Sequence, residues 1–243
     1  MKLSVAQIHP VNGDIEANIG KHKTLIDAAL SKRADAIIFP ELSLTGYEPT
    51  LAKQLARDPN DITFSDFQRI ADEKELVIGV GVPTRTRGGC CISMILFEPH
   101  RVRRIYSKKY LHRDEEEFFI TADNFSVFKI RDADIAPAIC YEISVPEHAE
   151  RAVANGADIY VASVNKSVAA IHTALGRLAE VARTYSMTVL MSNCVGFCDR
   201  SACAGKTSIW NDKGLLVGQL DDRSEGILII DTVTREVVKR RIN

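Results

Sequence analysis

The stretch Ile135-Ala-Pro-Ala-Ile-Cys-Tyr-Glu-Ile-Ser-Val-Pro-Glu147 joins a short apolar run to the start of a helical pattern. The run Ile135–Ile139 is typical of a buried strand. Pro146 followed by Glu147 indicates a helix start, because proline has no N–H to lose there and an acid suits the positive helix end. Cys140 therefore lies between a strand and a helix, where backbone N–H groups stabilise a thiolate. Most cysteines in such places are simply small buried hydrophobes, so Cys140 needs partners to be a nucleophile.

Strand and helix patterns alternate on both sides of this stretch. Helices are predicted at Asp14–Arg33, Asp61–Glu75, Glu147–Asn155 and Ala169–Ser186. Strands are predicted at Leu3–Ile8, Ala36–Phe39, Leu76–Val82, Cys90–Phe97, Val102–Tyr106, Phe125–Ile130, Ile135–Ile139, Ile159–Ala162, Thr188–Ser192, Lys206–Trp210, Leu215–Gln219 and Gly226–Ile230. Because no linker, composition shift or repeat divides the chain, we expect one domain, residues 1–243, folded as a layered α/β sandwich with mixed sheets.

Composition narrows the classes of partner. The formal net charge is −1 over 243 residues and no basic stripe is present, so nucleic acid and anionic membranes are not expected partners. No apolar run reaches the roughly 18 residues of a membrane span, and the N-terminal apolar stretch is too short for a signal peptide. We expect a cytoplasmic protein that acts on a small molecule.

Six cysteines do not make a disulfide framework in a chain of this length. Cys194, Cys198 and Cys203 are close in sequence, but they lack the paired C-x-x-C spacing of structural zinc and have no nearby histidine. We expect reduced thiols in and near strands, with no metal and no organic cofactor.

Three predicted strands end at a reactive side chain. Glu41 follows Ala36–Phe39, Lys108 follows Val102–Tyr106, and Cys140 follows its own strand. A lysine alone is most often solvated, whereas an acid directly after an apolar run tends to be buried and to need a partner. If the sheet brings the three together, they form a nucleophile, a base and an electrophilic group.

These residues resemble the hallmark of the nitrilase superfamily of carbon–nitrogen hydrolases, a Glu-Lys-Cys triad carried in three local patterns. The matching patterns are Phe39-Pro-Glu41, Tyr106-x-Lys108-x-x-Leu111, and Cys140-Tyr-Glu-Ile143 followed by Pro146-Glu147. All three occur in order, and the resemblance extends from Val5 to Asp231. It implies an αββα sandwich whose four layers form one domain, an amidase-like activity, and a homodimer or higher homo-oligomer.

The family also uses a second glutamate between the lysine and the cysteine. It usually lies seven residues before a glycine, and here Asp123 stands at that glycine position. Counting back gives Glu116, with Glu117 as the alternative, although a run of three glutamates is also typical of a solvated loop. The resemblance thus predicts that Glu116 orients Lys108 or the substrate.

The chemistry of these residues suggests a mechanism. Glu41 would take the thiol proton of Cys140, and the sulfur would attack the substrate carbonyl to form a thioester. Lys108 and the backbone N–H of Tyr141 would stabilise the negative charge that develops on the carbonyl oxygen. Family members that hydrolyse nitriles tend to carry tryptophan after the cysteine, so Tyr141 favours a small amide or N-carbamoyl substrate. Arg200 or Lys166 could bind a substrate carboxylate, but both are more commonly surface charges.

Two other functions remain open at this stage. An acyltransferase or condensing enzyme would use the same thioester with an amine in place of water. A catalytically silent binding protein could keep the fold, although such a protein has no reason to retain all three triad residues. Since no synthetase or membrane domain is present in the chain, we expect a stand-alone amidase.

Overall fold

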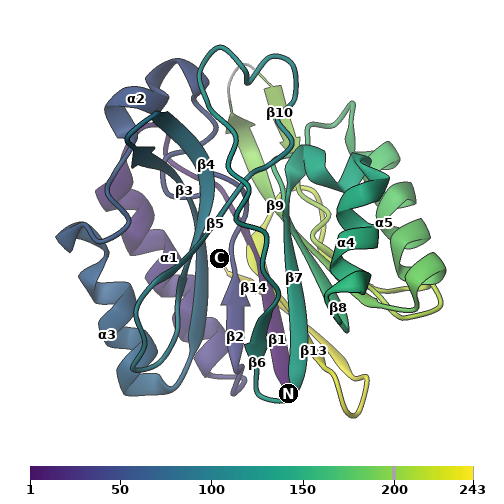
Figure 1. The fold of residues 1–243 in the computed structure, drawn as a ribbon. Helices are drawn as coiled ribbons and strands as arrows, with labels where there is room; N and C mark the ends of the chain where they lie inside the picture. Colours follow the sequence, from purple (N-terminus) through teal and green to yellow (C-terminus); the bar gives the residue numbers. More distant parts are fainter. Residues whose placement is uncertain (199–200, 243) are drawn as a thin grey trace.

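One fourteen-stranded sheet curls into two halves, referred to below as the two sheets, that lie face to face at the centre of the molecule, and helices cover both outer faces (Figure 1). The structure, a computed structural model, describes residues 1–198 and 201–242. Its elements are β1 (Lys2–Ile8), α1 (Ile15–Leu30), β2 (Ala36–Ile38), η1 (Pro49–Leu51), α2 (Ala52–Leu55), η2 (Ile62–Phe64), α3 (Ser65–Lys74), β3 (Val77–Thr86), β4 (Gly89–Phe97), β5 (Arg104–Ser107), β6 (Phe128–Ile130), β7 (Ala133–Ile139), η3 (Cys140–Ser144), α4 (Pro146–Ala154), β8 (Ile159–Ser163), α5 (Ile171–Tyr185), β9 (Thr188–Cys198), β10 (Ser201–Ala204), β11 (Ser208–Trp210), β12 (Leu216–Gln219), β13 (Glu225–Asp231) and β14 (Val237–Ile242).

The alternation of side chains along each strand builds three apolar layers. In β1, Leu3 and Val5 pack between the two sheets, whereas Ala6 and Ile8 pack on the other face beneath α1 and α3. Strand β8 alternates in the same way, with its outer face against α4 and α5. Because both faces of these strands are covered, they read as continuous apolar runs in the sequence.

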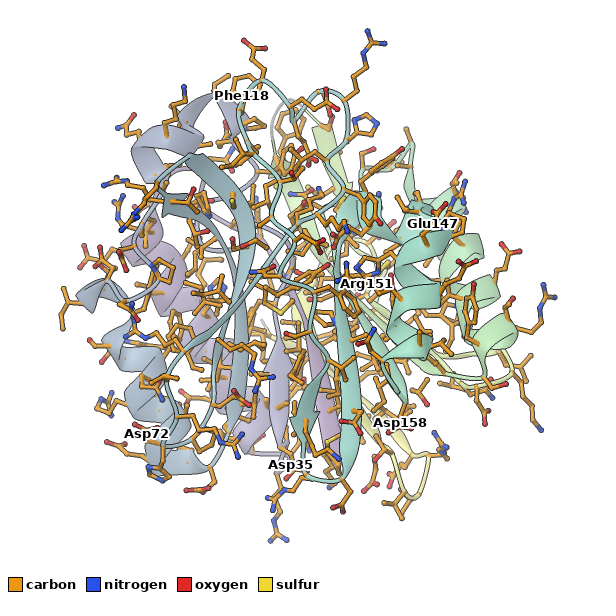
Figure 2. The ribbon with its side chains drawn as sticks, in the orientation of Figure 1. Asp35, Asp72, Phe118, Glu147, Arg151 and Asp158 are labelled. Carbon is orange, nitrogen blue, oxygen red and sulfur yellow. The ribbon has the colours of Figure 1, made fainter. Side chains whose placement is uncertain are left out.

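Strand direction brings three strand ends to one edge of the sandwich. Strands β2, β1, β9, β8 and β7 are parallel neighbours. Strand β5 is antiparallel to β4, which is antiparallel to β3, so β5 runs with β3 and with its parallel neighbour β2. Figure 2 shows Asp35 and Asp158, which precede β2 and β8, at the end of the molecule opposite Phe118. The carboxyl ends of β2, β5 and β7 therefore share the upper edge in this view.

The predicted fold class is confirmed, with one domain and helices outside two packed sheets. Each predicted helix and strand is present, with ends that differ by a few residues. The elements that went unpredicted are α2, β10 and β14, together with the short 3₁₀ turns η1 and η3. Strand β14 contains Lys239-Arg-Arg241 and pairs only with β13, so it lacks the apolar alternation that marks a buried strand. In the described part of the chain, no helix combines the length and hydropathy needed to cross a membrane.

Candidate active site

Three charged side chains from two loops, the turn after β2 and the connection between β5 and β6, meet in the interior and form what we call the lysine cluster: Glu41, Lys108 and Glu115. Lys108 Nζ donates to Glu41 Oε1 and to Glu115 Oε1, both at 2.7 Å. The Tyr47 hydroxyl donates to Glu115 Oε1 at 2.8 Å, and the His112 N–H donates to Glu115 Oε2 at 2.7 Å. None of the three clustered side chains belongs to a residue more than 1% exposed.

The turn after β2 holds Glu41 directly against β3. The Phe39 N–H donates to the Gly79 carbonyl at 2.8 Å, and the Leu44 N–H donates to the Gly81 carbonyl at 3.0 Å. A Cβ at residue 81 would lie 2.2 Å from the Pro40 carbonyl oxygen, so only glycine allows this approach. A small residue on the neighbouring strand thus lets the glutamate turn fold inward.

Cys140 occupies a strained backbone position at the first residue of η3, directly after β7. Its φ of +46° lies in the left-handed region, which non-glycine residues rarely adopt outside functional or tightly held turns. Its thiol lies 3.9 Å from the Asn165 carbonyl oxygen and is close enough to Glu41 and Lys108 for their charges to act on it. The predicted convergence of Glu41, Lys108 and Cys140 is therefore present in the structure.

A second buried network, the tyrosine cluster, ties the ends of β5 and β7 together; it consists of Tyr106, Glu142, His148 and Tyr160. Glu142 accepts the Ile139 N–H through Oε2 at 2.8 Å and the Lys109 N–H through Oε1 at 2.7 Å.

The hydroxyl groups complete this network. The Tyr106 hydroxyl donates to Glu142 Oε2 at 2.6 Å and lies 2.8 Å from His148 Nε2, while the Tyr160 hydroxyl lies 2.8 Å from His148 Nδ1. The set is satisfied if His148 is neutral, donating through Nε2 and accepting through Nδ1. Burial lowers the pKa of His148 to about 4, which agrees with the neutral form.

Burial sets the proton affinities of the reactive groups. Burial raises the pKa of Glu41, and the Lys108 charge opposes that shift only in part. Burial alone would lower the pKa of Lys108, but the charges of Glu41, Cys140 and Glu115 together raise it, so it stays an ammonium. Burial and the Glu41 charge raise the pKa of the Cys140 thiol to about 11. At neutral pH this thiol is protonated and needs a base.

Glu41 has one oxygen available for that task. Its Oε1 accepts from Lys108, whereas its buried Oε2 accepts no hydrogen bond from any residue that the structure describes. A buried carboxylate oxygen without a donor is costly and therefore rare. The Cys140 thiol interacts with this carboxylate and slightly favours its ionised form. Glu41 is thus placed to exchange a proton with Cys140.

Cys140 lies in the wall of a pocket of about 280 Å³. Glu115 contributes to the wall, whereas Glu41 and Lys108 lie behind it, shielded from solvent. The pocket is lined by Tyr47, His112, Asp114, Glu115, Cys140, Tyr141, Asn165, Lys166, Ser167, Ala170, Cys198, Ser201 and Cys203. Lys166 is therefore a pocket residue, and Arg200 lies outside the described residues.

The prediction of Glu116 as the second glutamate is wrong in its position, as is the alternative Glu117. Both side chains are exposed, and Glu115 is the glutamate that holds Lys108. The segment turns so that the Phe119 N–H donates to the Glu115 carbonyl at 2.9 Å. This helix-like turn places Leu111, Glu115 and Phe119 on one inward side, four residues apart. That spacing was the signal in the sequence that could have selected Glu115.

The five cysteines other than Cys140 are free thiols, as is Cys140 itself. The neighbouring Cys194 and Cys203 thiols lower the pKa of Cys198, and the Cys203 thiol donates to Asn165 Oδ1 at 3.2 Å. The main described influences on the pKa of Cys198 include no lysine or glutamate, whereas Glu41, Lys166 and Lys108 all act on Cys140. Within the described ranges, no group of three or more His, Cys, Asp or Glu residues is arranged to hold a metal ion. Sequence reasoning missed that Cys198 and Cys203 line the same pocket as Cys140.

Comparisons with known proteins agree with this geometry. Residues 2–241 match the family model described as carbon-nitrogen hydrolase. The chain belongs to the carbon–nitrogen hydrolase family. It is therefore an enzyme of the nitrilase superfamily, and the resemblance seen in the three sequence patterns is confirmed.

Individual relatives are distant but extend over the whole chain. A hydrolase in the agr operon of Staphylococcus aureus is 24% identical over all of this chain and 95% of its own length. A glutamine-dependent NAD(+) synthetase of Aquifex aeolicus is 25% identical over all of this chain but only 44% of its own length. A mutant amidase from Nesterenkonia sp. AN1, with acrylamide added at its active-site cysteine, superposes with a TM-score of 0.87 at 20% identity, covering 96% of this chain and 94% of that one. This carbon–nitrogen hydrolase thus shares its fold with an amidase.

Proposed function

We propose that this carbon–nitrogen hydrolase cleaves a small amide or N-carbamoyl compound through a thioester on Cys140. The observation that carries the proposal is the placement of the lysine cluster directly behind Cys140 in the pocket wall. Glu41 takes the thiol proton as general base while the sulfur attacks the carbonyl carbon. Because Cys140 has a pKa of about 11, attack without such a base would be slow at neutral pH.

The same residues serve both halves of the reaction. Lys108 and the backbone N–H of Tyr141 stabilise the oxyanion, and one such donor is worth ~3–4 kcal/mol. Glu41 then gives its proton to the departing amine, which leaves a thioester on Cys140. Water attacks the thioester with Glu41 again as base, and the acid product and the free thiol are released. Glu115 holds the Lys108 ammonium in place throughout.

The test of this proposal is ammonia release from a panel of acetamide, propionamide, butyramide and N-carbamoyl amines. Cys140→Ala should lower kcat by at least about 10⁴-fold, because removing a nucleophile removes the covalent route. Cys90→Ala, which changes a buried thiol on β4 outside the pocket, should retain activity close to wild type. Equal activity of the wild type and Cys140→Ala would contradict the proposal.

An amine could replace water as the acyl acceptor. This alternative is supported by the match of the whole chain to 44% of a glutamine-dependent NAD(+) synthetase. Hydroxylamine added to the amide reaction separates the two. Hydrolysis gives mainly the carboxylic acid with little hydroxamate, whereas a transferase gives hydroxamate and little acid in the presence of the acceptor.

We also propose that the protein forms a homodimer through the outer face of α4 and α5. Along α5, Ile171, Ala174, Leu178 and Ala182 are buried against the sheet. Val181 is half-buried and lines a groove with Val145 and Pro146, as expected of a helix with more apolar surface than its own sheet covers. Light scattering at micromolar concentration should give about twice the chain mass of 26.9 kDa. A mass of one chain would contradict the dimer.

A further inference from the structure

The charged groups that line the pocket in the described part of the chain are paired, with one exception. Glu115 is held by Lys108, and Asp114 Oδ1 is bound to His112 Nδ1. The Lys166 ammonium has neither an ion pair nor a hydrogen bond with any residue in the described ranges 1–198 and 201–242, although its residue is half-buried. An ammonium that loses part of its hydration without gaining a partner is unfavourable. Among the described residues of its wall, the pocket therefore presents one cationic group without a protein partner.

The backbone at Lys166 is fixed, so its side chain starts from a defined point in the pocket wall. The Lys166 N–H donates to Asn193 Oδ1 at 2.8 Å, and its carbonyl accepts from the Ala204 N–H at 2.9 Å. Asn193 in turn donates to the Gly205 carbonyl at 2.7 Å. A lysine held by its backbone on two sides, with a free head group, is better placed to bind a ligand than a lysine on a mobile loop.

The Lys166 charge reaches the reacting thiol. Burial and Glu41 raise the pKa of Cys140, and Lys166 is first among the charges that oppose them, ahead of Lys108. The ammonium therefore lies within electrostatic range of the atom that attacks the substrate. A ligand group bound to Lys166 would belong to the same small molecule as the amide attacked by Cys140.

We propose that Lys166 binds a carboxylate of the substrate, so that the preferred substrates are small amides that carry an acid group, such as monoamides of short dicarboxylic acids. This inference rests on the amide hydrolysis proposed above. A carboxylate would supply the charge-assisted hydrogen bond that the ammonium lacks. The pocket, about 280 Å³, is at the lower end of ligand-site volumes and suits a short substrate.

A competing role for Lys166 is to favour the Cys140 thiolate whatever the substrate. The two roles differ in what a substitution changes. A carboxylate-binding lysine raises KM for acidic amides and leaves kcat nearly unchanged, because it holds ground state and transition state alike. A thiolate-stabilising lysine changes the rate for every amide by the same factor and also slows alkylation of Cys140 by iodoacetamide.

The test compares succinamate and glutaramate with their methyl esters, by ammonia release, in the wild type, Lys166→Met and Lys53→Met. Lys53 is the matched control, since it is an exposed lysine on α2 without an ion pair in the described structure. Lys166→Met should raise KM for the two acids about tenfold to a hundredfold, as expected for one hydrogen bond between charged groups, and should change the esters by less than about twofold. Equal losses for acids and esters would overturn the inference.

Charge reversal gives a result that a folding defect cannot mimic. Lys166→Glu should disfavour succinamate and improve the use of 4-aminobutyramide, whose ammonium fits the new carboxylate. Loss of activity on both compounds, with a wild-type unfolding transition, would count against a ligand-binding side chain.

A binding measurement separates failure of this inference from failure of the proposed function. Calorimetry with Cys140→Ala should show succinamate binding that is lost in the double variant Cys140→Ala/Lys166→Met. Binding without any turnover by the wild type would retain the carboxylate site and reject amide hydrolysis. Turnover of neutral amides without a preference for acids would retain hydrolysis and reject the carboxylate site.

Discussion

The two buried clusters use neighbouring residues in different ways. Lys108 enters the lysine cluster through its side chain, and Lys109 enters the tyrosine cluster through its backbone N–H. Burial raises the pKa of the carboxylate in both, at Glu41 and at Glu142. The difference lies in the acceptors. Both oxygens of Glu142 accept hydrogen bonds, whereas Glu41 Oε2 has no described donor and the Glu41 carboxylate interacts with the Cys140 thiol. A raised pKa therefore does not by itself mark a reacting carboxylate, and an unsatisfied oxygen near a nucleophile is the better indicator.

The largest expected difference between the clusters is in turnover. Glu41→Gln keeps the shape of the side chain but cannot take the thiol proton, so kcat should fall by about 10²–10⁴-fold. The measurement is the initial rate of ammonia release, with thermal unfolding as the check on folding. Activity within about tenfold of wild type would show that another group is the base.

A smaller effect should follow from loss of the second carboxylate. Glu115→Gln weakens the hold on the Lys108 ammonium, and we expect kcat to fall by about 10–100-fold. Glu116→Gln and Glu117→Gln are matched controls on the same segment, and their exposed side chains should leave kcat within about twofold. If Glu116→Gln proved the damaging change, the assignment of Glu115 would be wrong.

The tyrosine cluster should respond in stability more than in rate. In Glu142→Gln, the amide can no longer accept every hydrogen bond that the two carboxylate oxygens take now. The free energy of unfolding should fall by about 1–3 kcal/mol and kcat by less than about tenfold. Chemical denaturation and steady-state rates measure both. A loss of rate as large as that of Glu41→Gln, at wild-type stability, would give Glu142 a direct part in the chemistry.

The smallest expected effect is a displacement of the pH profile. Glu41 acts as a base only when ionised, so kcat/KM should rise with pH through its pKa. Because burial raises this pKa, the acid limb should lie above the ordinary glutamate value of 4.5. The Cys140 thiol, with a pKa of about 11, should give no alkaline limb before that pH. Glu142→Gln should leave the acid limb in place, and a limb that moved with this substitution would assign the titration to Glu142.

The sequence was sufficient to predict three positions of the site, one glutamate, the lysine and the cysteine. Glu41, Lys108 and Cys140 each follow an apolar strand, and strands that run in one direction bring their carboxyl ends to one edge. The three family patterns supplied the expectation that these strand ends meet.

The second glutamate and the tyrosine cluster required coordinates. Three consecutive glutamates are chemically identical in sequence, and only the turn of the segment decides that Glu115 faces inward. Tyr106 on β5 and His148 on α4 are 42 residues apart, and no local sequence pattern indicates that their side chains meet. Contacts between distant elements are set by tertiary packing. A sequence pattern can therefore identify the elements but not which of their residues meet.

The most direct test of the account is the identity of the acylated thiol. Wild-type protein would be mixed with a hydrolysed amide, quenched in acid within the first turnovers, and mapped by peptide mass spectrometry. We expect the acyl mass on the peptide that contains Cys140 and an unmodified peptide for Cys198, a thiol of the same pocket whose pKa is lowered. An acyl group on Cys198, or ammonia release without any acyl group on Cys140, would contradict the lysine cluster as the catalytic centre.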